Sequence, residues 1–152
     1  MKGTSRLSVE ERISTPARNA DRAVGRHARQ ILVVDGDLGL VLWVARTLVE
    51  AGYAAFPAPS VKEARMLAVR LDPRLNVLVV NSKLAGAAEL VDRLKCNRPD
   101  LKVAVFVDTE NPPIGSPPFA DVVIPKPTHT DRKTASHLVH VIDRLLTLHR
   151  AA

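Results

Sequence analysis

Short apolar runs alternate along the chain with longer segments in which apolar residues recur at helical spacing. Continuous apolar runs of four to six residues are typical of strands that are buried on both faces of a parallel sheet, and the segments between them then supply the crossover helices. From Gln30 onward the pattern predicts five βα units and therefore an α/β domain. The predicted strands cover residues 31–34, 53–56, 75–80, 103–107 and 122–124.

Three of the segments between strands predict helices, and a fourth helix is predicted after the last strand. Gly52 follows the first of them, where a glycine is suited to ending a helix. Ser60 and Glu63 have the spacing of a capping box at the start of the second. The apolar positions that share a face are Val41, Val44, Ala45 and Leu48 in the first helix, Val61, Ala64, Ala68 and Leu71 in the second, Leu90, Val91 and Leu94 in the third, and Leu138, Val141, Ile142, Leu145 and Leu148 in the last.

The connection between the fourth and fifth predicted strands breaks this alternation. Residues 108–119 contain four prolines, at positions 112, 113, 117 and 118. Proline lacks the backbone donor of a helical turn and its ring clashes with the preceding turn. We therefore expect no normal helix in this connection.

Length and charge divide the chain into an arm and one domain. The 152 residues suit a single domain with its own core, over residues 30–149. Residues 1–29 hold seven basic residues against three acidic ones, so most of the net charge of +6 lies there, and we expect a disordered or loosely helical basic arm. Aromatic residues make up only 3% of the chain, too few for a base-stacking platform, so we expect no nucleic-acid binding by the folded domain.

Cysteine usage and hydropathy bear on the compartment. Cys96 is the single cysteine, so no internal disulfide can form. No stretch has the pattern of a signal peptide or the length of a membrane span, and we therefore expect a cytoplasmic protein without membrane association.

The residues that carry candidate chemistry follow the ends of the predicted strands. In an open parallel sheet, ligands bind beyond the carboxyl ends of the strands. If the strand order is 2-1-3-4-5, these ends meet in one cluster. Its members are Asp35, Gly36 and Asp37 after the first strand, Asn81 after the third, Val107 and Asp108 at the end of the fourth, and Lys126 and Pro127 after the fifth.

In this order and spacing, residues 30–149 resemble a bacterial response-regulator receiver domain. The resemblance rests on the run from Ile31 to Asp35, on Gly52-Tyr53, on the run from Val77 to Val80, and on Lys126-Pro127. It implies a flavodoxin-like, doubly wound, five-stranded parallel sheet of order 2-1-3-4-5. Because of its prolines, the fourth helix of that fold is expected to be missing or replaced by a loop.

The resemblance also implies roles for the clustered residues. In the family, two acidic residues after the first strand bind magnesium, an aspartate after the third strand is phosphorylated, and a hydroxyl and a lysine contact the phosphoryl group. Here Asp35 matches the first acid and Lys126 matches the lysine. The departures are Gly36 at the second acidic position, Asn81 at the phosphoacceptor, Val107 at the hydroxyl and Val123 at the switch aromatic.

These departures predict a pseudo-receiver that is not an enzyme. A carboxamide is neutral, is a poor nucleophile and offers magnesium no anionic oxygen. Phosphoryl transfer depends on positioning and charge stabilisation, so losing the nucleophile, a metal ligand and the hydroxyl together leaves the site little to do. We expect magnesium binding through the remnant ligands Asp35 and Asp37 to be lost or weak, and no other cofactor. Lys126 is expected to pair with Asp35 and to donate to the amide oxygen of Asn81.

The function that follows is a stand-alone receiver-like protein of two-component phosphorelay signalling that acts by protein–protein contact. The expected partners are a histidine kinase, another response regulator or a phosphorelay component, and a homodimer is possible. The contact surface is expected on the first and last helices, or on the last strand and helix. Two alternatives stay open: an atypical phosphoacceptor that uses Asp37 or Asp108, and a module that senses a small anion or nucleotide near Lys126. Lys83 and Asp108, which flank this cluster, are either solvated residues at the mouth of a loop or joined as a substitute internal ion pair.

Overall fold

A computed structural model describes residues 29–71, 74–110, 115 and 117–151. The predicted basic arm, apart from Arg29, lies outside the described residues. The elements, in chain order, are β1 (Gln30–Val34), α3 (Leu38–Glu50), β2 (Ala54–Ala58), α4 (Val61–Leu71), β3 (Leu75–Asn81), α5 (Ala87–Asn97), β4 (Lys102–Val107), β5 (Val122–Pro125) and α6 (Arg132–Ala151).

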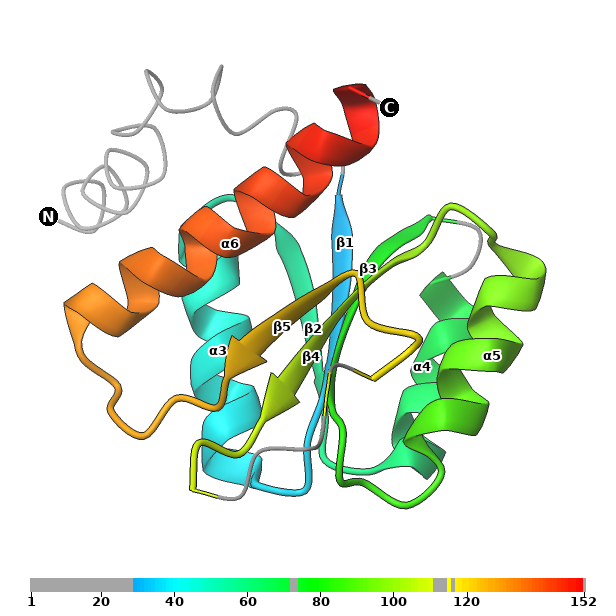
Figure 1. Cartoon of the computed structure of the whole chain (residues 1–152), viewed down its shortest axis with the longest axis horizontal. Helices are drawn as coiled ribbons and strands as arrows, with labels where there is room; N and C mark the ends of the chain where they lie inside the picture. Colours follow the sequence, from blue (N-terminus) through cyan, green and yellow to red (C-terminus); the bar gives the residue numbers. More distant parts are fainter. Residues whose placement is uncertain (1–28, 72–73, 111–114, 116, 152) are drawn as a thin grey trace, which may run out of the picture.

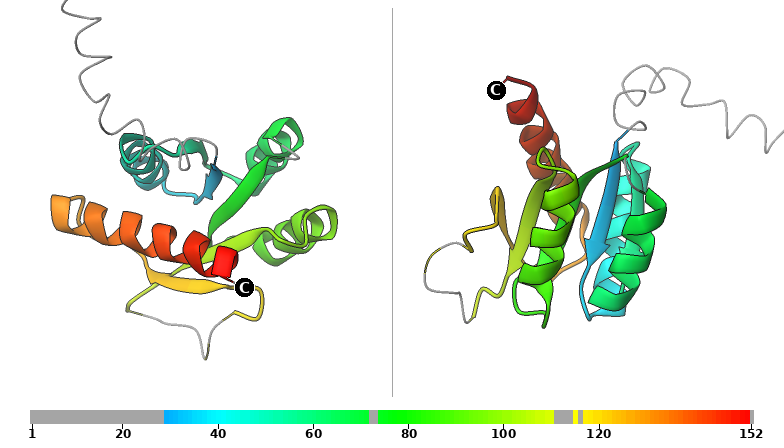
Figure 2. Two further views of the ribbon diagram at one scale, coloured as in Figure 1. Left: turned by 90° about the horizontal axis from the view of Figure 1, so that it is seen from above. Right: turned by 90° about the vertical axis from the view of Figure 1, so that its right-hand side faces the viewer.

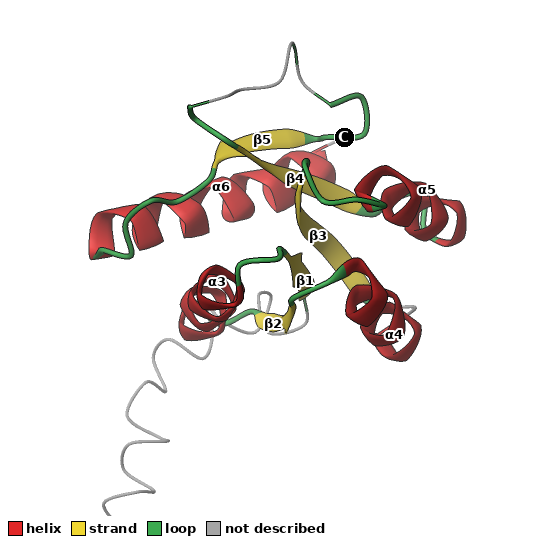
Figure 3. Cartoon of the chain, turned by 90° about the horizontal axis from the view of Figure 1, so that it is seen from below, coloured by secondary structure: helices red, strands yellow, loops and turns green. Residues whose placement is uncertain are grey.

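The five strands form one parallel sheet in the order β2-β1-β3-β4-β5, which confirms the predicted fold class. α3 and α6 cover one face of the sheet, and α4 and α5 cover the other (Figure 1, Figure 3). The same separation into layers is visible from above in the left-hand view of Figure 2. Crossover helices on both faces bury the central strands on both sides, which is why those strands read as unbroken apolar runs.

Alternate residues of the strands belong to two separate hydrophobic cores, one on each face of the sheet. Ile31 and Val33 point to the core beneath α3 and α6, whereas Leu32 and Val34 point to the core beneath α4 and α5. All four helix faces predicted from spacing contribute to these cores. Val141 of α6 is only partly buried, and the side chain of Leu148 lies outside the described part.

The second strand is the element whose predicted bounds differ most. It begins at Ala54 and continues through Pro57 to Ala58. Tyr53 is instead a buried residue of the preceding turn, where its amide donates to the carbonyl of Leu48. β2 is an edge strand, and an edge strand tolerates a proline because one side of its ladder has no partner. Because proline is disfavoured inside strands, the prediction ended this strand at residue 56, before Pro57.

Side chains cap the helices near the carboxyl edge of the sheet. The Asp37 carboxylate accepts from the amide of Leu40 at 3.1 Å and begins α3. The Ser60 hydroxyl accepts from the amide of Glu63 at 3.2 Å, as the capping-box spacing predicts. After α3, Gly52 has a φ of 103°, a conformation that costs glycine little.

The connection between β4 and β5 contains no helix among its described residues, in agreement with the prediction from its prolines. Phe119 and Ala120 pack against the core beneath α4 and α5 instead. Asp121 then ties the segment to the start of β4, because its amide donates to the Val103 carbonyl at 2.8 Å and its carboxylate accepts from the Val103 amide at 2.7 Å. A short loop thus takes over part of the covering role of a helix.

Across the described ranges, which begin at residue 29 and have gaps at 72–73, 111–114 and 116, no helix is both long and apolar enough to cross a membrane.

Candidate functional site

Asp35 is the buried centre of the cluster at the carboxyl edge of the sheet. It follows β1 directly, and its side chain is only 3% exposed. One of its carboxylate oxygens, Oδ1, accepts from the backbone amide of Asp37 at 3.0 Å. The other, Oδ2, faces Asn81 and Lys126. A buried carboxylate needs partners of this kind, because its transfer out of water is costly without them.

Asn81 is the last residue of β3 and lies beside Asp35. The register explains this, since Val34 pairs with Val80 and the next residue on each strand is Asp35 or Asn81. The Asn81 Nδ2 atom donates to Asp35 Oδ2 at 3.1 Å. An aspartate at this position would present a second anion, so the amide turns a repulsive contact into a hydrogen bond.

The amide oxygen of Asn81 is occupied by a contact that sequence reasoning missed. It accepts from the backbone amide of Lys83 at 2.9 Å, not from the Lys126 ammonium as expected. This is an Asx-type turn, in which an asparagine side chain bonds the backbone two residues further on. The succession Asn81-Ser82-Lys83 at the end of an apolar strand was the available signal.

Lys126 approaches the same carboxylate from β5. Its Nζ atom lies 3.5 Å from Asp35 Oδ2, which confirms the predicted ion pair. Its backbone amide donates to the Val107 carbonyl at 2.8 Å and so fixes the end of β5 against β4. Val107 is buried, and Val123 is half-buried against the core beneath α4 and α5. Neither offers a hydroxyl or an aromatic ring to the cluster.

The donor set does not fit a magnesium ion. Magnesium requires oxygen ligands in a near-octahedral arrangement. Asp35 is instead the target of three nitrogen donors, and Gly36 supplies no side chain. The Asp37 carboxylate is exposed and is used for capping α3. The side chains of this cluster therefore form hydrogen bonds and ion pairs with one another and leave no set of oxygen ligands for a metal ion.

Lys83 and Asp108 form a second, outer pair. Lys83 Nζ lies 3.1 Å from Asp108 Oδ2, and the two side chains are 53% and 36% exposed. The other oxygen of Asp108 accepts from the amide of Glu110 at 2.9 Å. Lys83 and Asp108 therefore pair, but both are solvated at the mouth of the cluster, so the predicted alternative of an internal ion pair is wrong.

The chain matches no protein-family model and no curated protein in sequence. Solved structures do match it. The receiver domain protein (CheY-like) of Methanospirillum hungatei has a TM-score of 0.64 at 14% identity, covering 83% of this chain and all of that one. The chemotaxis response regulator CheY4 of Vibrio cholerae has a TM-score of 0.59 at 19% identity, covering 77% of this chain and 98% of that one.

The described domain has the fold of a response-regulator receiver domain. A third similar structure, NtrX of Brucella abortus in complex with ADP, has a TM-score of 0.64 at 27% identity and covers 80% of this chain but only 27% of NtrX. As predicted, the strand order of this fold brings Asp35, Asn81 and Lys126 together. Asp37, Val107 and Asp108 lie around them, but their side chains serve capping, core packing and an outer ion pair.

Proposed function

We propose that this receiver-like protein takes part in two-component signalling without being phosphorylated at Asn81, and that it is not an enzyme. The observation that carries the proposal is the hydrogen bond from the Asn81 amide to the buried Asp35 carboxylate. This hydrogen bond supports a site in which the Asp35 carboxylate is surrounded by neutral and cationic donors of the protein itself. Such a site needs neither a metal ion nor a phosphoryl group to neutralise its charge.

The alternative phosphoacceptors are supported less well. One oxygen of Asp37 is bound to the amide of Leu40, and both oxygens of Asp108 have partners, in Lys83 and Glu110. On Asp108 a phosphoryl group would have to replace one of these two contacts, and on Asp37 it would occupy the second oxygen of an exposed carboxylate that begins α3. The Asp108 side chain is also 36% exposed, unlike the buried Asp35.

Intact mass measurement tests the absence of phosphorylation. The full chain is incubated with magnesium and acetyl phosphate beside a conventional receiver domain as a positive control. We expect an adduct on the control alone. A phosphate adduct on this chain, located by peptide mapping at Asp35, Asp37 or Asp108, would overturn the proposal.

We propose that the signal passes by protein contact, and the first and last helices provide a candidate surface. Leu38, Leu42 and Val49 of α3 are between 51% and 55% exposed although they are large and apolar. They are spaced so that they follow one side of α3, which packs beside α6. An apolar stripe on a helix suits a helical partner, so we propose a histidine kinase, another regulator or a phosphorelay component in the cytoplasm.

Affinity capture tests this surface. The tagged full chain should retain a kinase or regulator that Leu38→Glu/Leu42→Glu loses, and the control Ala88→Glu, at an exposed position of α5 on the other face of the sheet, should keep it. Repeating the capture without residues 1–29 separates the domain from the arm. Loss of every partner on that deletion, with the α3 variant unaffected, would place the function in the arm.

Small-anion sensing is a second candidate because a hollow of about 320 Å³ lies beside Lys126. Lys126, His129, Lys133 and His137 line it, together with three threonines. Phosphate or a nucleotide would raise the melting temperature of the wild type by mass action if it bound there. The rise should disappear in Lys133→Ala, and its absence from the wild type would remove this candidate.

A further inference from the structure

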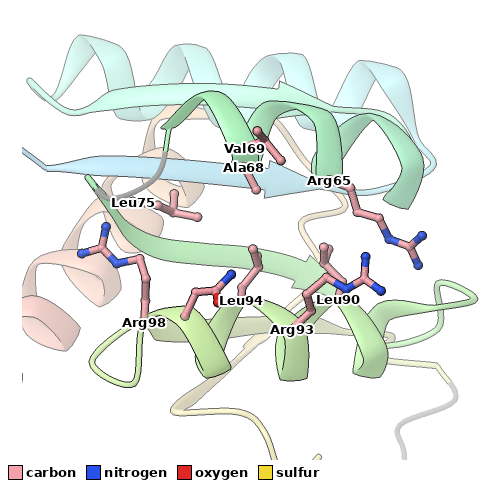
Figure 4. Close-up of a pocket in the computed structure, with 9 residues that line it drawn as sticks. Arg65, Ala68, Val69, Leu75, Leu90, Arg93, Leu94 and Arg98 are labelled. Atoms are coloured by element: carbon pink, nitrogen blue, oxygen red, sulfur yellow. The ribbon is translucent and has the colours of Figure 1, made fainter.

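A pocket of about 190 Å³ opens between α4 and α5, on the face of the sheet opposite α3 and α6. Its apolar lining includes Ala68, Leu75 and Leu90, which are buried, and Leu94, which is half-buried. Figure 4 shows these side chains between the two helices and the start of β3. Because Leu75 begins β3 and Asn81 ends it, this pocket and the Asp35 cluster are different sites.

Every charged residue that lines the pocket is an arginine. Arg65 comes from α4, Arg93 from α5, and Arg98 follows α5. Arg65 and Arg93 are exposed, and the described residues offer neither guanidinium a carboxylate within ion-pair distance. Glu89 and Asp92 line an outer hollow that Arg65 and Arg93 also border, but neither acidic residue is part of the lining of the pocket. The pocket therefore presents an apolar interior with a cationic rim.

The surroundings extend the apolar surface outward. Val69, on the pocket's edge, is 79% exposed. A single exposed apolar residue is ordinary, but Val69 adjoins the buried apolar lining and the arginines of the pocket. Arginine beside an apolar centre is enriched at protein interfaces.

The size of the pocket favours a side chain as its occupant. Pockets for drug-sized ligands measure roughly 300–1,000 Å³. A volume of about 190 Å³ is smaller and suits one large apolar side chain, such as the anchor residue of a protein interface. The lining contains no aromatic ring on which a base could stack, so a nucleic acid is the poorer match for the arginines.

We propose that the α4–α5 pocket docks an acidic segment of a partner protein. One large apolar side chain of that segment enters the pocket, and carboxylates on either side of it pair with Arg65 and Arg93. Arginine suits this role because its planar guanidinium binds a carboxylate through two parallel hydrogen bonds. The inference rests on the proposed function, in that it names a contact surface for a protein that signals by contact.

A peptide titration tests the docking site. The ¹⁵N-labelled full chain is titrated with a blocked Glu-Glu-Phe-Glu-Glu peptide while its backbone amide signals are recorded. We expect shifts confined to α4, α5 and the start of β3. Arg65→Glu/Arg93→Glu should weaken binding at least about tenfold, because both carboxylate partners become repulsive. Lys62→Glu/Arg70→Glu is the matched control, since it changes the net charge equally at exposed positions of α4 outside the pocket, and it should weaken binding less than about threefold.

Four outcomes would overturn the proposal. These are an unchanged spectrum, equal shifts with Ala in place of the peptide's Phe, equal weakening in both double variants, and shifts on another surface. Concentration-dependent shifts without peptide would assign the face to a second copy of the chain. Tighter binding of hexanoate than of the peptide would assign it to small amphiphiles. A phosphate adduct in the mass experiment would instead overturn the proposed function and leave the peptide result standing.

Discussion

Asp35 is the one buried carboxylate in the part of the chain that the structure describes, and Asn81 places an amide beside it where the receiver family has an anion. Asp35 has three donors around it, namely the Asn81 amide, the Lys126 ammonium and the amide of Asp37. Only one of them is charged, so the cluster is close to neutral. The buried carboxylate therefore needs no further partner to offset its charge, and for this reason we expect one conformation in place of a switch.

Asn81→Asp should lower the free energy of unfolding by about 1–3 kcal/mol in the absence of magnesium. The hydrogen bond to Asp35 becomes a contact between two carboxylates, which Lys126 alone must compensate. Urea unfolding with and without magnesium measures the effect, and magnesium should recover part of the loss. Asn97→Asp, the same change at an exposed position, serves as the control. A variant as stable as the wild type without magnesium would show that the amide contact is unimportant.

Lys126→Ala and Lys83→Ala should differ, because the two lysines pair with carboxylates of unequal burial. Lys126 faces Asp35, which is 3% exposed, and its removal should cost about 1–3 kcal/mol by leaving a buried charge with neutral donors only. Lys83 faces Asp108 at the surface, where such pairs contribute about 0–1 kcal/mol. Urea midpoints of the two variants compare these costs directly. Equal losses would contradict the burial argument.

Among the elements, the connection from β4 to β5 differs most from a receiver domain with all five helices. The sequence predicted a connection without a normal helix, and the described residues of the connection contain none, because proline acts locally through its own ring and its missing donor. It did not foresee that Phe119 and Ala120 would close the core, since that depends on the path of the chain in space. The same distinction holds for Pro57, whose place in β2 depends on the strand lying at the edge of the sheet.

Phe119→Ala should therefore destabilise the domain although Phe119 lies in a loop. The side chain is half-buried against the core beneath α4 and α5, so we expect a loss of about 1–2 kcal/mol, below the value for a fully buried phenylalanine. Chemical unfolding measures it. Pro118→Ala, at the exposed neighbouring position, should change stability far less, and the opposite ranking would show that the loop does not cover the core.

The start of α6 should respond to acid. The hydrogen bonds from the side chain and backbone of Thr134 hold the pKa of Asp131 below its ordinary value. A carboxyl with a lowered pKa adds stability that is fully present above the ordinary range of aspartate and is lost as the pH falls through the lowered pKa. The difference in melting temperature between the wild type and Asp131→Asn should thus stay constant from neutral pH down to that range and then decrease. A difference independent of pH throughout would contradict this assignment.

At the scale of the whole molecule, the convergence of Asp35, Asn81 and Lys126 was predictable because strand order fixes which strand ends meet. The α4–α5 pocket was not. Arg65 and Arg93 lie on different helices, and each reads in the sequence as an ordinary solvated residue. Arg65 and Arg93 lie beside one pocket only because the two helices pack next to each other on one face of the sheet, and a local sequence pattern does not predict that packing.

Restoring the family's pattern tests whether the fold still supports phosphorylation. Gly36 accepts a side chain sterically, because an added Cβ would meet only Leu84 Cδ2 at 3.7 Å and its φ is not positive. We expect Gly36→Asp/Asn81→Asp/Val107→Thr to take up phosphate from acetyl phosphate with magnesium, as seen by intact mass. Asn81→Asp alone should do so more slowly, since positioning and charge compensation are incomplete.

The phosphorylated triple variant should change little beyond the cluster. Val123 stands where the family has its switch aromatic, and the described part of the connection after β4 contains no helix to move. Backbone amide shifts on phosphorylation should therefore stay within the loops at the carboxyl edge of the sheet. A switch needs a second, nearly isoenergetic arrangement to shift toward, and replacing the residues that bind phosphate does not create one. Shifts extending along α6 would show that such an arrangement exists and that only its trigger was lost.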